Sequence, residues 1–141
     1  MKQVLVTVQS IQRDENGQDL KIELVSTGKY YEKKNARYIV YEESEITGMA
    51  GVTTIIKIID GVIVLLRLGK IHQRQEFRKG QTARSSYKMP FGVITVGMKT
   101  YELNIDLDDG IGTIEIGYDV IIEGIGTNYN QLTITVQEDK A

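Results

Sequence analysis

The fold is decided by one stretch, Val52-Thr53-Thr54-Ile55-Ile56-Lys57-Ile58-Ile59-Asp60-Gly61-Val62-Ile63-Val64-Leu65-Leu66-Arg67-Leu68-Gly69. Two apolar runs flank Asp60-Gly61, a dipeptide typical of the two-residue turn of a β-hairpin. This turn predicts that Ile59 lies opposite Val62, and counting on places Thr54 opposite Arg67. Both faces of the hairpin are largely apolar. We therefore expect the core to cover one face and a neighbouring element or subunit to cover the other.

Apolar and polar residues also alternate along most of the remaining chain, which is typical of half-buried strands. The clearest case is Tyr101–Asp108, where Tyr, Leu, Ile and Leu alternate with Glu, Asn, Asp and Asp. We expect its acidic side to face water. No segment has the pattern of an amphipathic helix. About eight to ten hairpin-linked strands predict an all-β fold, a single closed antiparallel barrel that is mostly up-and-down. Gly97, Gly112 and Gly117 are expected to mark bends or bulges.

Length and composition predict one soluble domain over residues 1–141. The chain has 141 residues, no Cys and a net charge of -2. The lack of Cys excludes disulfides and thiolate metal sites. The N-terminal residues do not resemble a signal peptide, and no apolar stretch is long enough to cross a bilayer as a helix. We therefore expect a cytoplasmic protein without a membrane or nucleic-acid partner.

Charge is unevenly distributed along the chain. The segment Arg67–Lys88 has Glu76 as its one acid and carries seven bases: Arg67, Lys70, Arg74, Arg78, Lys79, Arg84 and Lys88. The segment Tyr101–Glu123 contains acidic residues but no Lys or Arg. Two interpretations are open. The two regions attract each other weakly or pair between subunits, or the basic segment forms a surface for an anionic ligand.

Arg67 is the sharpest candidate for function. The hairpin register places it on a face shared with Ile56, Ile63 and Leu65, and a charge on an apolar face requires a partner. In a structural role Arg67 caps carbonyls, pairs with Glu76 or extends to solvent. In a functional role it anchors a carboxylate or phosphate inside the barrel.

A second candidate lies on the strand that follows. His72, Arg74 and Glu76 share one face of it, while Gln73, Gln75 and Phe77 share the other. A four-residue connection, Arg78–Gln81, would place Tyr87 opposite His72 and bring an acid, a base and a phenol together. Such a group suits general acid/base catalysis, or it is a solvated face with cross-strand pairing.

Other sites are less well supported. His72 is the only His in the chain, and a lone His without Cys rarely holds a metal; we expect neither a metal nor a cofactor. Tyrosines cluster early in the chain, at Tyr30, Tyr31, Tyr38 and Tyr41. They are expected to pack at the barrel ends, or, as for Tyr41, to line a ligand site.

Two blocks of sequence resemble a known family. One runs from Tyr41-Glu42-Glu43 through Thr47-Gly48-Met49-Ala50-Gly51 to Ile58. The other joins Arg67-Leu68-Gly69, Arg74-Gln75-Glu76-Phe77, Gly80, Tyr87, Pro90 and Gly92. Together they are similar to the YwiB-like proteins, small bacterial proteins of uncharacterised function. The resemblance implies a calycin-like (lipocalin-like) barrel but supplies no mechanism. The sequence differs from those of true lipocalins, which usually carry a Gly-x-Trp motif, because this chain has no Trp.

The sequence therefore supports three hypotheses. In the first, the barrel binds a small anionic or amphipathic ligand inside it or at its mouth, through Arg67, Arg74, Glu76, Tyr87 and Tyr41. In the second, the barrel is packed shut and forms a homodimer through its two-faced hairpin. The third and weakest is an enzyme that uses Glu76, His72 and Tyr87. A cavity lined by Arg67 and tyrosines would favour the first.

Overall fold

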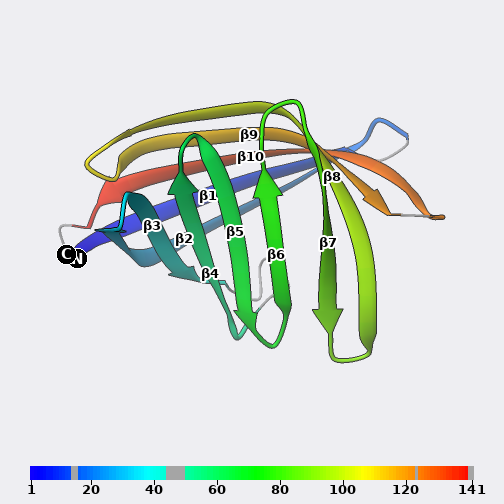
Figure 1. The fold of residues 1–141 in the computed structure, drawn as a ribbon, viewed down its shortest axis with the longest axis horizontal. Helices are drawn as coiled ribbons and strands as arrows, with labels where there is room; N and C mark the ends of the chain where they lie inside the picture. The colour runs from blue at the N-terminus through cyan, green and yellow to red at the C-terminus, as the bar shows by residue number, and fades with distance from the viewer. Residues whose placement is uncertain (14–15, 44–49, 123, 140–141) are drawn as a thin grey trace.

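The computed structural model describes residues 1–13, 16–43, 50–122 and 124–139, with every side chain in these ranges except those of Tyr87 and Met89. The described residues form ten strands and no helix. The strands are β1 (Lys2–Arg13), β2 (Asp19–Lys33), β3 (Ala36–Glu42), β4 (Val52–Ile59), β5 (Val62–Gly69), β6 (His72–Phe77), β7 (Thr82–Met89), β8 (Gly92–Asp108), β9 (Ile111–Ile122) and β10 (Gly126–Glu138). Each strand pairs with its neighbour in sequence, and β1 pairs with β10 (Figure 1). The predicted all-β, closed antiparallel barrel is confirmed.

The β4–β5 hairpin has the predicted register. Ile59 pairs with Val62, and Thr54 pairs with Arg67. Asp60 and Gly61 both have positive φ, 51° and 74°, as a type I′ turn requires. This turn twists in the same sense as the strands it joins, so the local sequence alone sets the register of the pair.

The core fills the inside of the barrel through the alternation of each strand. Val4, Val6 and Val8 of β1 and Ile114 and Ile116 of β9 are buried, while the intervening residues point outward. The acidic residues of β8 from Glu102 to Asp108 are exposed, as predicted. Burial of the inward side chains is the main force that holds the barrel closed.

The predicted inward position of Tyr101 is wrong because β8 contains a bulge. Its register with β9 shifts between Thr100 and Glu102. The extra residue turns Tyr101 outward, where it is 43% exposed and its hydroxyl donates to Asp119 Oδ2 at 2.7 Å. Thr100 lies inside with no exposed surface. Glu102 pairs with Gly117, so the extra residue of this bulge lies on β8, opposite the glycine. The registers through Gly97 and Gly112, where bends or bulges were also expected, run without a shift.

The predicted register of β6 with β7 is wrong by one residue. His72 pairs with Lys88, and Tyr87 pairs with Gln73. The connecting turn bonds to β8 instead of extending the β6–β7 ladder. In it, Gly80 N donates to Thr100 O at 2.8 Å and Gln81 O accepts from Thr100 N at 3.1 Å. The turn's position is therefore set by a strand that is distant in sequence.

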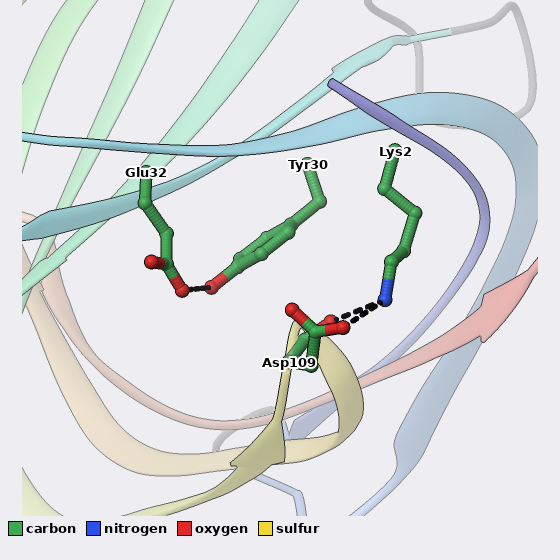
Figure 2. A network of polar contacts seen from close by, with 4 residues as sticks. All are labelled: Lys2, Tyr30, Glu32 and Asp109. Carbon is green, nitrogen blue, oxygen red and sulfur yellow. Dashed lines mark hydrogen bonds and ion pairs between the residues drawn. The ribbon is translucent and has the colours of Figure 1, made fainter.

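One end of the barrel is plugged (Figure 2). The β8–β9 turn, Asp109-Gly110, folds against Tyr30, which is 3% exposed. Lys2 Nζ donates to the backbone oxygen of Asp109 at 2.8 Å and to its Oδ2 at 2.7 Å. The Tyr30 hydroxyl donates to Glu32 Oε1 at 2.8 Å. The start of β1 and the end of β10 lie at this same end (Figure 1). We call it the plugged end and the opposite end the open end.

Helices of the length and apolar character needed to span a membrane are absent from the described ranges. The cytoplasmic location stays a prediction.

Candidate functional site

The open end of the barrel contains a cavity of about 460 Å³. Leu65, Val96, Met98, Val120 and Leu132 contribute to its apolar wall. Its polar lining residues are Ser10, Gln12, Tyr41, Glu43, Arg67, Gln73, Gln75, Tyr118 and Asn130. Glu43 directly follows β3, and the others lie on β1, β3, β5, β6, β9 and β10. A cavity of this size with a mixed lining is typical of a small-molecule site.

Arg67 lines this cavity. A role as an anchor for an anion inside the barrel requires this inward position. Its Nη1 donates to Gln73 Oε1 at 2.6 Å, and the two residues are directly paired across β5 and β6. Its Nε is enclosed and has no hydrogen-bond partner among the described residues. Arg67 also forms no ion pair within this part of the chain. The cavity wall therefore carries a guanidinium charge held by one neutral side chain.

Two further polar groups on the cavity wall form no hydrogen bond among the described residues. The Gln75 side chain is 5% exposed and makes no hydrogen bond there. The Tyr118 hydroxyl likewise has no partner there, while its ring packs edge-on against Phe77 with centroids 4.9 Å apart. Burial raises the pKa of Tyr118, and the nearby charge of Arg67 opposes that rise. Tyr118 thus stays a neutral hydroxyl, able to donate or accept.

Tyr41 and Glu43 form the acidic side of the cavity. Glu43 Oε1 accepts from the hydroxyl of Thr54 at 2.7 Å in a buried contact. Burial raises the pKa of Tyr41 most strongly, and the charge of Glu43 raises it further, whereas Arg67 lowers it. Arg67 and Glu43 are therefore close enough to act on the same phenol, and the cavity holds one base and one acid.

Arg74 and Glu76 do not line this cavity, although they were candidates. They lie on the outer surface of β6, where Arg74 Nη2 is 3.3 Å from Glu76 Oε1. The inward side of β6 belongs to Gln73, Gln75 and Phe77, each 5% exposed or less. The sequence pattern assigned these five residues correctly to the two faces of β6. Of the candidate residues, Arg67 and Tyr41 lie together on the cavity wall, whereas Arg74 and Glu76 lie outside the barrel.

Tyr87 does not pair with His72, so the register that supported a catalytic group of His72, Glu76 and Tyr87 is absent. His72 is exposed on the outer surface. The side chain of Tyr87 lies outside the described residues. Within the described ranges, no group of three or more His, Cys, Asp or Glu residues could hold a metal ion.

Sequence reasoning missed Gln73, Gln75 and Tyr118 as cavity residues. A usable signal existed on β6, because both glutamines alternate in step with Phe77, the residue of that strand with the strongest tendency to be buried. Tyr118 shares a strand face with the buried Ile114 and Ile116. Its role was hidden because a strand pattern does not distinguish a filled interior from a hollow one.

The fold and the cavity define the class of protein: a small antiparallel β-barrel with one plugged end and one open, mixed-lined end. The chain belongs to the family described as a domain of unknown function (DUF1934), whose model matches residues 6–134. It is 33% identical over 134 residues to the uncharacterized β-barrel protein YwiB of Bacillus subtilis (strain 168), covering 95% of this chain and 92% of that protein.

The fold is also similar to the crystal structure of the Bacillus subtilis YwiB protein. The TM-score is 0.88 at 30% sequence identity, over 99% of this chain and 93% of that one. The resemblance to YwiB-like proteins is therefore confirmed, and so is the barrel. The finer comparison with calycins and lipocalins stays a prediction. Thr47, Gly48 and Met49 of the first family block lie outside the described residues.

Proposed function

We propose that this barrel binds a small anionic or amphipathic molecule in the cavity at its open end. The observation that carries the proposal is the state of Arg67, which lines the cavity, has an enclosed Nε without a partner and forms no ion pair among the described residues. Buried polar groups in folded proteins are nearly always satisfied, and a buried charged donor without an acceptor is costly. A carboxylate, sulfonate or phosphate would supply the missing negative charge.

The rest of the lining suits the same kind of ligand. The Gln75 amide and the Tyr118 hydroxyl can add hydrogen bonds beside Arg67, and the apolar wall can take a hydrocarbon or aromatic portion. In this proposal Arg67 anchors the anionic group, and Tyr41 and Tyr118 shape the wall around it.

The proposal can be tested with two fluorescent probes of similar size. One is 1-anilinonaphthalene-8-sulfonate, an aromatic anion, and the other is N-phenyl-1-naphthylamine, its neutral counterpart. Arg67→Ala should weaken binding of the anion by about tenfold to a hundredfold, because a hydrogen bond to a charged group is lost in a partly desolvated site. Binding of the neutral probe should change little. Both dissociation constants are measured by fluorescence titration of the folded protein.

Arg74→Ala is the matched control, since it removes an arginine from the outer surface of the neighbouring strand. It should leave both dissociation constants unchanged. If both arginine variants weaken the anion equally, the effect is one of general charge, and the assignment of Arg67 is overturned. If neither probe binds the wild-type protein, and native mass spectrometry of protein purified from cells shows only the unliganded chain, the cavity is not a ligand site.

A further inference from the structure

The cavity at the open end has polar groups on two opposite walls. In the ring of strands, the path from β5 to β10 runs through β6, β7, β8 and β9 on one side and through β4, β3, β2 and β1 on the other. The two strands therefore face each other across the barrel. Arg67 lines the cavity from β5, and Asn130 lines it from β10 beside its register partner Gln12 of β1. The first wall thus carries a positive charge, whereas the polar lining of the second is uncharged.

Asn130 offers an unused acceptor to the cavity. Its side chain is only 5% exposed, and its Nδ2 donates to the backbone oxygen of Asn128 at 3.2 Å. This bond fixes the orientation of the amide, because only the nitrogen can donate. Asn130 Oδ1 accepts no hydrogen bond among the described residues and is not an enclosed atom, so it is reached from the cavity. Buried polar atoms nearly always have a partner, and here the partner has to enter the cavity.

Apolar side chains line the cavity between these two walls. Val96 and Met98 of β8 and Val120 of β9 are lining residues on strands that lie between β5 and β10 in the ring. Val96 and Met98 are buried. A ligand that reaches from one polar wall to the other therefore passes an apolar surface, which favours a hydrocarbon middle.

We propose that the ligand is an acid with a second, uncharged polar group at its far end, and that Asn130 selects this group. The proposal rests on the anion-binding function proposed above and adds the ligand class. Arg67 binds the anionic end, and Asn130 Oδ1 accepts from a hydroxyl or N–H group at the other end. A plain acid leaves the buried acceptor of Asn130 unpaired, which costs free energy. Asn130 is thus a specificity-determining residue that favours hydroxy acids over plain fatty acids.

Straight-chain acids and their ω-hydroxy counterparts test the proposal. Octanoate, decanoate and dodecanoate are each compared with the hydroxy acid of the same length by titration calorimetry. At the length that spans the cavity, the hydroxy acid should bind wild-type protein about twofold to tenfold more tightly, as one added hydrogen bond predicts. Asn130→Leu removes the acceptor and should abolish or reverse this preference, because the hydroxyl is then buried without a partner. Arg67→Ala should weaken both acids alike and leave their ratio unchanged.

Two further variants keep the test decisive. Asn104→Leu makes the same substitution at an exposed position on β8 and should change neither affinity. If circular dichroism shows that Asn130→Leu does not fold, Asn130→Ala removes the amide without added bulk and should give the same loss of preference.

The outcomes separate this proposal from the proposed function. A wild-type protein without preference for the hydroxy acid at any length, or a preference that persists without the Asn130 amide, overturns the assignment of Asn130. The anion-binding function stands in that case if the plain acids bind and depend on Arg67. If no acid binds the wild-type protein, the ligand class is overturned, and the two fluorescent probes decide the proposed function independently.

Discussion

Arg67 occupies an inward position that the sequence could place on a strand but not on a side of the sheet. Both faces of its hairpin are apolar, so alternation gave no direction. The structure shows the direction through Thr54, which pairs with Arg67 across the hairpin and has no exposed surface. Directly paired residues lie on the same face of a sheet, so Arg67 also points inward. At the scale of single residues, the chemistry of the site was therefore visible in the sequence, whereas its orientation was not.

The same limit explains the choice between the two faces of β6. Arg74 and Glu76 drew attention because they are charged, yet charged side chains favour the surface. Gln73 and Gln75 are less conspicuous and lie inside. A buried glutamine next to a buried phenylalanine is the stronger indication of a polar cavity, since it must be satisfied or must face a hollow.

Tyr30 provides a pH-dependent test of the plugged end. Burial and its hydrogen bond to Glu32 raise the pKa of Tyr30 to about 12. The folded protein therefore holds the neutral phenol between pH 10 and about 12, where the unfolded chain ionises it. Stability from this group is complete below about pH 10 and falls as the pH rises towards 12.

We expect Tyr30→Phe to abolish this part of the alkaline destabilisation. The variant keeps the ring against Gly110 and loses the bond to Glu32, so at pH 8 it should be less stable by about 1 kcal/mol. Between pH 9 and 11.5 the free energy of unfolding of the wild type should fall by about 1 to 2 kcal/mol more than that of the variant. Urea unfolding at each pH measures the difference. Parallel pH curves for the two proteins would contradict the assignment.

Elements were predicted well where the register is local and poorly where it depends on distant strands. The Asp60-Gly61 turn fixes the β4–β5 pair by itself. The Arg78–Gln81 turn bonds to Thr100 of β8, and the β6–β7 register moves by one residue as a result. The bulge at Thr100 is another feature that strand alternation does not reveal, because only the partner strand shows that a residue is extra.

Two glycines on neighbouring strands should respond very differently to substitution. A Cβ at Gly112 would lie 1.9 Å from the backbone oxygen of Asp106, at a φ of +146°. The nearest atom to a Cβ at Gly97 is 3.7 Å away, in Ile121. Gly112→Ala should therefore cost roughly 2 to 4 kcal/mol, and Gly97→Ala should change stability by less than about 1 kcal/mol. Thermal unfolding of the two variants compares them directly, and equal losses would refute the close approach at β9.

Closure of the whole barrel is weakest between β6 and β7. Their ladder consists of two residue pairs at one end, Gln73 with Tyr87 and His72 with Lys88. Farther along, the Ser85 hydroxyl donates to the backbone oxygen of Arg74 in place of a ladder bond. By contrast, β8 and β9 pair along nearly their full length. The barrel is thus a continuous sheet with one thinly bonded junction.

Hydrogen exchange should locate this junction. Amides of Arg74–Phe77 and Thr82–Ser86 that face each other should exchange with solvent at least tenfold faster than those of Ile114–Tyr118 in β9, because fewer bonds must open. Exchange measured by mass spectrometry on wild-type protein provides the comparison. If both regions are protected to the same degree, the barrel opens only as a whole and this weak junction does not exist.

The sequence by itself determined the all-β class, the strand positions, the closed barrel and the family, because alternation, glycine turns and motif residues are local properties of the chain. Only the tertiary structure decided which end is plugged, which β6 face lines the cavity, and that Arg67 points inward. These features depend on registers between strands far apart in sequence. A shift of one residue reverses every side chain, and no local pattern encodes that shift.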